Sequence, residues 1–224
     1  MRPPAALSAA LLVAVVAALP AGCGRRDEPV SPAATARPAP AAVRAADDWR
    51  TLVTPADAST LGRLDQAWRL ARAEAEAAGF ARQVEGLGPL VDPYAGLAGD
   101  VPPAPGDYRC RTLRLGARAA GDPAHAETAW GRCAVALTPD GELWLTADTG
   151  FGRSRGRLYP DTGRRLVFLG ARAGEADGAD APAYGDQRAR DRIGVFERIG
   201  PARWRLVIPW PRQAAKLEIV ELAD

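Results

Sequence analysis

The sequence predicts an α+β fold, with an N-terminal helix packed on a curled antiparallel β-sheet or a small closed β-barrel. Apolar residues recur at helical spacing from Leu61 to Ala78, which predicts one long amphipathic helix. After residue 106 the chain changes to short alternating segments separated by turn residues, as in antiparallel sheets. With 224 residues, 47% of them hydrophobic, the chain can form one domain with a sizeable core.

The first 22 residues have the features of a bacterial export signal. Arg2 supplies a positive charge, and the apolar stretch from Ala5 to Leu19 is too short to span a bilayer. We therefore expect residues 1–22 to be a signal peptide that is removed from the mature protein.

Cys23 follows this signal in a context that resembles the bacterial lipobox, in which the cysteine is lipidated and becomes the new N-terminus. Ala21 and Gly22 match that pattern, whereas Pro20 stands where leucine is usual. Conventional cleavage after Ala21 would place bulky Leu19 where a small residue is needed. We predict lipidation of Cys23, and the alternative is cleavage to a soluble periplasmic protein.

Residues 23–46 are expected to form a disordered tether. They are rich in proline and alanine and contain almost no large apolar residues, so they cannot bury enough surface to become ordered. By resemblance to bacterial lipoproteins, Gly24 after the cysteine favours the outer membrane. The predicted location is the periplasm, with a single domain over residues 47–224 anchored to that membrane.

Within this domain we expect three consecutive parts, a helical one, a connector and a β-rich one, over residues 54–86, 87–106 and 107–224. Thr54 suits a helix N-cap, Pro55 the first helical position and Asp57 a capping box. Gly79 offers a stop, and Gly62 weakens the early turns. The connector is punctuated by glycine and proline.

Seven segments of the β-rich part have the alternation of strands: DYRCRTLRL, TAWGRCAVAL, ELWLTAD, RRLVFLGA, DRIGVFERI, ARWRLVIP and KLEIVELA. Such a sheet is expected to curl or close, because closure removes exposed edges. The alternation places one set of apolar side chains on the inner face, namely Cys133, Val135, Leu137, Leu143, Leu145, Trp204, Leu206 and Ile208.

The three cysteines also favour an exported protein. If Cys23 carries lipid, Cys110 and Cys133 remain as an even pair in an oxidising compartment. They fall on the first two predicted strands, and an antiparallel pairing could bring them within bridging distance. We predict a disulfide between them, with two buried free thiols as the alternative.

The motifs that would indicate chemistry are weak. Residues 152–156, GRSRG, match the nucleophile elbow of α/β-hydrolases, but the single histidine, His125, precedes Ser154 instead of following it. We expect Ser154 on an exposed hairpin and His125 solvated in a polar loop. With one histidine and no CxxC or HxxxH pattern, we predict no metal ligand, cofactor or catalytic residue.

Arg153, Arg155 and Arg157 are candidate anion contacts, because they alternate along one face of a strand. The interpretation that we favour is that these charges protect an exposed sheet edge from aggregation. Across the whole chain, 29 basic and 27 acidic residues give a net charge of +2, which argues against nucleic acid as a partner.

Four segments resemble the bacterial family catalogued as domain of unknown function 4893: DWRTLVTPAD, PPAPGDYRCRTLRLG, RRLVFLG and ERIGPARWRLVIPWP. The resemblance covers nearly everything after Asp48, and the last segment is the most specific. It brings no activity, cofactor or catalytic residue. Members of the family resemble exported proteins, which agrees with the signal peptide read from the residues.

These observations predict a cell-envelope lipoprotein that acts as a non-enzymatic binding or interaction module. Its expected partners are the membrane, through the lipid on Cys23, and an envelope protein or a small apolar ligand in the mouth of the barrel. The alternative is an enzyme that acts on an envelope component, with acids and arginines on its loops.

Metabolic labelling with a palmitate analogue tests the lipid anchor. We expect label on Cys23 of the mature protein, because lipidation makes this cysteine the N-terminal residue. An unlabelled mature chain that begins at another residue would contradict the prediction.

Overall fold

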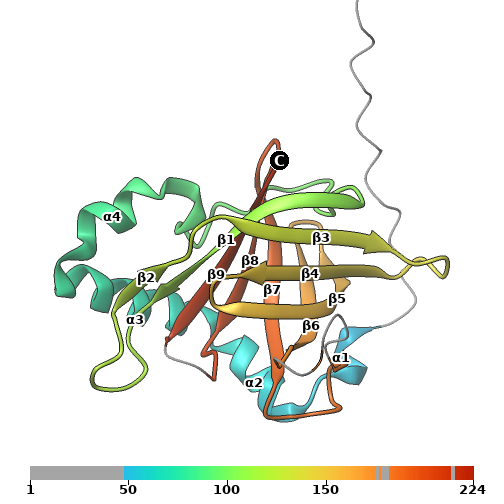
Figure 1. Cartoon of the computed structure of the whole chain (residues 1–224), viewed down its shortest axis with the longest axis horizontal. Coiled ribbons are helices and arrows are strands. Elements are labelled where there is room, and N and C mark those ends of the chain that lie inside the picture. The colour runs from blue at the N-terminus through green and yellow to red at the C-terminus, as the bar shows by residue number, and fades with distance from the viewer. Residues whose placement is uncertain (1–47, 175–176, 178–181, 213–214) are drawn as a thin grey trace, which may run out of the picture. The chain divides into compact units, whose positions relative to one another are not determined.

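The computed structural model describes residues 48–174, 177, 182–212 and 215–224, which form a β-barrel with helices along one side (Figure 1). The helical elements are α1 (Trp49–Leu52), α2 (Pro55–Gly62), α3 (Leu64–Ala75), η1 (Glu76–Phe80), α4 (Ala81–Gly86) and η2 (Gly88–Leu90). The strands are β1 (Gly106–Leu115), β2 (His125–Glu127), β3 (Gly131–Leu137), β4 (Leu143–Thr149), β5 (Gly152–Thr162), β6 (Arg165–Arg172), β7 (Asp191–Gly200), β8 (Arg203–Pro209) and β9 (Leu217–Ala223).

Eight antiparallel strands close the barrel. They follow one another in the order β1-β3-β4-β5-β6-β7-β8-β9, and β9 pairs back with β1 from Leu217 to Ala223. The short strand β2 is an extra strand that pairs with the end of β1. The structure therefore has a closed barrel, not an open curled sheet, and the domain is mostly β, so the predicted α+β class fits it only loosely.

Apolar side chains fill the middle of the barrel. The predicted inner-face residues are buried there together with Phe168 and Phe196, with one exception. Leu137 is 38% exposed, because it lies beyond Val135, the last residue of β3 that pairs with β1. Packing is tight, since a Cβ added at Gly170 would lie 2.6 Å from the Phe168 ring. The barrel therefore has a solid apolar core.

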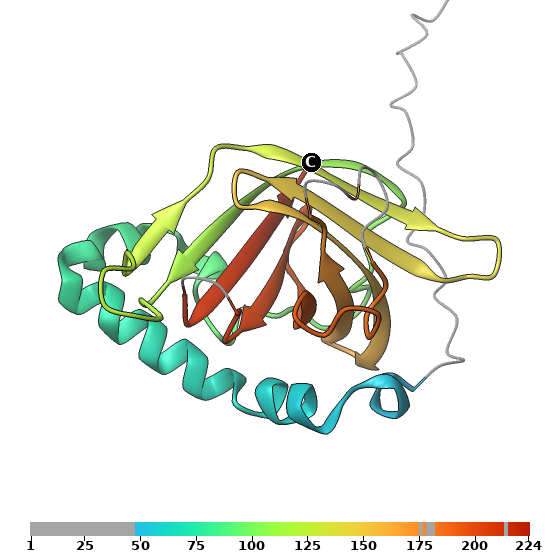
Figure 2. The same ribbon diagram turned by 60° about the horizontal axis from the view of Figure 1, so that its bottom comes forward.

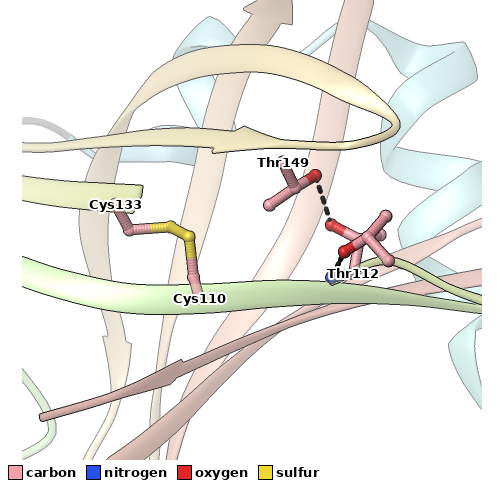
Figure 3. Close-up of a disulfide and its surroundings, with 5 residues drawn as sticks. Cys110, Thr112, Cys133 and Thr149 are labelled. Atoms are coloured by element: carbon pink, nitrogen blue, oxygen red, sulfur yellow. Dashed lines mark hydrogen bonds between the residues drawn. A yellow bond between two sulfur atoms is a disulfide. The ribbon is translucent and has the colours of Figure 1, made fainter. Parts of the chain in front are cut away.

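A disulfide joins Cys110 and Cys133, as the sequence predicted (Figure 3). The two cysteines lie on the paired strands β1 and β3, with their Cα atoms 5.7 Å apart, and both are buried in the barrel. Beyond Cys110, β1 leaves β3, and the hydroxyls of Thr112 and Thr149 are 2.8 Å apart there (Figure 3). The disulfide thus fixes β1 at the point where its partner changes.

The helical part is broken into short helices instead of one long one. Thr54 caps α2 as predicted, because its hydroxyl accepts a hydrogen bond from the amide of Asp57 (3.2 Å). The helix ends at Gly62, and Gly79, with φ at +93°, turns the chain inside η1. None of the helices in the described part of the chain is long and apolar enough to cross a membrane.

The helices run along the outer wall of the barrel (Figure 2), and a second apolar core lies between these two layers. The buried face of α3 consists of Ala67, Trp68, Ala71 and Ala75. It packs in one cluster with outward-facing barrel residues such as Val207 and Ile219. Small alanines let the helix approach the wall closely, so each strand under the helices is buried on both faces.

Arg205 ties the connector to this wall. Its side chain is fully buried, and its Nη1 donates to the carbonyls of Pro89, Leu90 and Asp92 at 2.7–3.0 Å. Its Nε and Nη2 donate to the carboxylate of Glu197 at 2.8 and 2.6 Å. A single buried guanidinium thus joins β7, β8 and the connector through five contacts.

Replacing Arg205 by methionine is expected to lower the free energy of unfolding by about 3–5 kcal/mol. Methionine fills a similar volume but leaves the Glu197 carboxylate and the three connector carbonyls without this partner. Arg203→Met on the same strand is the control, because the Glu221 carboxylate keeps Arg111 at 2.7 Å, and about 1 kcal/mol or less is expected. If urea unfolding showed equal losses of unfolding free energy for the two variants, the special role of Arg205 would be contradicted.

Candidate functional site

One end of the barrel interior is charged, in contrast to its apolar middle. Arg114 on β1 lies opposite Glu218 on β9, on the strand faces that carry Cys110 and Leu222 into the barrel. Arg192 on β7 pairs with Gly170, and Arg172 on β6 pairs with Ser154. These pairings place three guanidinium groups and one carboxylate at the same end of the barrel.

Hydrogen bonds connect most of this cluster. The carboxylate of Glu218 is 2% exposed and accepts from Arg114 Nε at 2.8 Å and from Arg192 Nη2. Arg192 Nη1 donates to the hydroxyl of Ser154 at 2.6 Å. Arg172 donates to the carbonyl of Phe151 and has no ion pair within the described residues. The cluster therefore carries an excess of positive charge.

The charges in this cluster shift the pKa values of its members. Burial alone would raise the pKa of the Glu218 carboxyl, but Arg192 and Arg114 outweigh it, so the pKa is lowered and the group stays ionised. Burial lowers the pKa of Arg172, and the neighbouring charges of Arg192 and Arg114 lower it further against the opposing effect of Glu218. An anion near Arg172 would relieve this repulsion.

A cleft of about 530 Å³ lies at this end of the barrel, between α2 and the connection from β8 to β9. Two acids, Asp57 and Asp191, and an apolar surface that includes Ile208 and Trp210 line it. Its cationic lining residues are Arg63, Arg118, Arg190, Arg192, Arg212 and Lys216. The cleft thus combines an apolar wall with a majority of positive charges.

Several of these cations already have partners. Arg190 pairs with Asp177 at 2.5 Å and Lys216 with Glu74, and Arg118 donates to the carbonyl of Pro211 at 2.6 Å. The Nε of Arg63 donates to the backbone carbonyl of Ser59, and the Arg63 side chain has no carboxylate partner in the part of the chain that the structure describes. Arg63 and Arg118 can therefore turn toward a bound anion without leaving a carboxylate unpaired.

Trp210 occupies an unusual position in the wall of the cleft. It has a φ of +48°, the only positive φ of a non-glycine residue within the described ranges. Its Nε1 is buried without a hydrogen-bond partner there, and the Arg63 guanidinium lies 5.7 Å from the centre of its ring. Strained backbone and an unused donor are features that accumulate at binding sites.

Tyr184 forms a hydrogen bond with Asp57 at the edge of the cleft. The tyrosine hydroxyl donates to the carboxylate at 2.6 Å and accepts from the amide of Thr54 at 3.2 Å. Burial and the hydrogen bond to Asp57 raise the pKa of Tyr184 to about 12. Hydrogen bonds from the Tyr184 and Thr54 hydroxyls thus hold the Asp57 carboxylate at the edge of the cleft.

The three arginines singled out in the sequence lie elsewhere, on the outer wall of the barrel. Arg153 pairs with Asp148 at 2.9 Å and Arg157 with Glu142 at 2.8 Å, while Arg155 stacks on a tryptophan ring. Strand β5 is paired on both sides, so the expectation of an exposed sheet edge is wrong. Cys23 lies outside the described residues.

Two further expectations need correction. Ser154 is 4% exposed and points into the barrel, so it is not on an exposed hairpin. His125 lies on β2, stacked on Phe80 with ring centres 5.0 Å apart, and is not solvated. The described residues contain no group of three or more His, Cys, Asp or Glu side chains that could hold a metal ion.

Sequence reasoning missed the charged barrel end. The signal was present, since Arg192 has the same strand parity as the inward-facing Phe196, and Glu218 the same parity as Val220. Charged residues at inward positions of a strand mark either a pair or a site. Extending the inner-face assignment to the strand segments that became β7 and β9 would have marked both residues as inward-facing.

The family model described as domain of unknown function matches residues 49–222, which include the helices and all of the barrel except the last residue of β9. The chain belongs to the DUF4893 family. No curated protein and no solved structure matches it. The predicted resemblance is confirmed. The comparisons assign no activity to this DUF4893 domain, so its geometry is the basis for proposing a role.

Substitution of Tyr184 by phenylalanine tests the hydrogen bond at the cleft edge. The raised pKa means that the neutral phenol stabilises the fold below a pH of about 10, the ordinary tyrosine pKa, and that this stabilisation is lost as the pH rises toward 12. The unfolding free energy of the unaltered protein should therefore fall more steeply over this range than that of Tyr184→Phe. Tyr94→Phe, at a position 87% exposed, should behave like the unaltered protein.

Proposed function

We propose that this domain is a non-enzymatic binding module that holds an amphipathic anion in the cleft between α2 and the β8–β9 connection. The observation that carries the proposal is the excess of cations over acids around a partly apolar cavity of about 530 Å³. A carboxylate, sulfonate or phosphate group suits the arginines, and a ring or short chain suits the tryptophan wall.

Because side chains fill the barrel, we place the ligand at the end of the barrel and not inside it. The inner-face residues form one buried apolar cluster, in which Phe168 and Phe196 are at most 1% exposed. An apolar ligand in the barrel mouth would have to displace them. The cleft offers space without such a cost, and its cations favour an anionic ligand over the purely apolar one expected from the sequence.

The two acids of the cleft favour binding over catalysis. Asp57 is engaged by Tyr184 and Thr54, and one oxygen of Asp191 accepts from the amide of Gly185 at 3.0 Å. The other oxygen of Asp191 is buried and has no partner in the described structure. That free oxygen is the one feature that supports the alternative, an enzyme acting on an envelope component.

We further propose that the chain is exported and anchored in the outer membrane through Cys23. The signal peptide and lipobox-like residues of the sequence support this proposal. So does the disulfide between Cys110 and Cys133, because such bonds persist in oxidising compartments. An anchored domain would present its cleft to ligands of the envelope.

Fluorescence titration with 1-anilinonaphthalene-8-sulfonate tests the cleft, with N-phenyl-1-naphthylamine as the uncharged counterpart. The sulfonate should bind at least tenfold more tightly than the amine. The double variant Arg63→Gln/Arg118→Gln should weaken sulfonate binding roughly tenfold, which corresponds to about 1.4 kcal/mol for lost charge-assisted contacts.

Arg155→Gln is the matched control, because Arg155 lies on the outer wall and stacks on Trp144 with 4.5 Å between its guanidinium and the ring. It should leave the affinity for the sulfonate within about twofold of the unaltered protein. Equal binding of the charged and uncharged probes, or an equal loss in Arg155→Gln, would refute the proposed site.

A further inference from the structure

A second cavity, of about 530 Å³, lies at the turn between β4 and β5. Gly150, Phe151 and Gly152 line it from the turn, and Arg114 and Arg172 line it from the barrel. It shares no lining residue with the cleft. This second cavity, which we call the turn pocket, is therefore separate from the cleft.

Arg114 presents an unused donor to this region. Its Nε is fixed on Glu218 at 2.8 Å, and its guanidinium lies 4.0 Å from the centre of the Phe151 ring. Its Nη2 is buried and has no hydrogen-bond partner within the described residues. Buried donors of a charged group are rarely left unsatisfied, because their desolvation costs free energy.

Arg172 faces the turn pocket from the neighbouring side. It donates to the carbonyl of Phe151, and a Cβ added at Gly152 would lie 2.9 Å from its Nη2. Gly152 has a φ of +106°, so the turn passes closely over the guanidinium in a conformation that favours glycine. The position of Arg172 is thus fixed by the turn and not by a carboxylate.

The charges around the turn pocket do not balance. Glu218 is shared between Arg114 and Arg192, and Arg172 has no carboxylate of its own in the described structure. Three positive groups therefore face a single negative one in a partly buried place, where water compensates poorly. A bound anion would supply the missing charge and the missing acceptors.

We propose that Arg114 and Arg172 form a phosphate-binding site in the turn pocket. The planar guanidinium groups match the oxygens of a phosphate group, which can accept from both at once. The volume admits inorganic phosphate and also a small phosphomonoester. Phe151 covers the site from the turn, with its ring on one arginine and its carbonyl on the other.

Calorimetric titration at constant ionic strength, with inorganic phosphate and with α-glycerophosphate, tests this site. At least one of the two should bind with one-to-one stoichiometry and raise the Tm by about 3–5 °C at ten times its Kd. Arg172→Gln should weaken the binding at least fivefold. Arg172→Lys keeps the positive charge but loses the planar guanidinium with its paired donors. This variant should bind phosphate with an affinity between those of the unaltered protein and Arg172→Gln.

Arg63→Gln is the matched control, because Arg63 lines the cleft and not the turn pocket, and it should change phosphate affinity less than twofold. In turn, Arg172→Gln should retain binding of the naphthalene sulfonate, which separates this site from the proposed function. Binding of inorganic phosphate identifies the free anion as the ligand, and binding of α-glycerophosphate alone identifies a phosphomonoester. If neither binds, or if Arg63→Gln loses phosphate as strongly as Arg172→Gln, the inference fails.

Discussion

The buried guanidinium of Arg205 is the constraint on which the arrangement of the two layers depends. A charge placed between a barrel wall and a helical layer costs several kcal/mol unless every donor is satisfied, and here Glu197 and three carbonyls of the connector satisfy it. The connector must therefore follow one path along β8. Trp68 lies beside the same group, with its ring 5.1 Å from the guanidinium, so α3 is positioned with it.

This placement of the helices determines where the proposed binding cleft lies. With α3 fixed on the wall, α2 reaches the charged end of the barrel and forms one side of the cleft. The apolar middle of the barrel is occupied by its own side chains, whereas the end contains arginines in excess of acids. The apolar core and the charged groups of the proposed site thus lie in separate parts of one structure.

The strands and their inner face could be predicted because their period of two is local, and all seven strand segments named from the sequence occur in the barrel. The disulfide followed from the even pair of cysteines and from their positions on the first two predicted strands. The break at Gly62 was only partly predictable, since a glycine weakens a helix without fixing where it ends.

The site was harder to predict, because it depends on which residues meet across strands. Glu218 is adjacent to Arg114 only after β9 has paired with β1, and nothing local in the sequence shows that pairing. The cleft likewise requires α2 and the β8–β9 connection to lie together, although they are far apart in the chain. Single-strand periodicity cannot contain this information.

The pairing of the first barrel strand with the last one also affects the order of events during synthesis. Arg109 lies opposite Ala223, so the barrel cannot close until the final residues of the chain have emerged. Joining segments separated by about a hundred residues is slow compared with forming hairpins, because the entropy of a large loop must be lost first. A nascent chain of this kind keeps its inner apolar face open until β9 arrives, so burial of the barrel core is the last step of its folding.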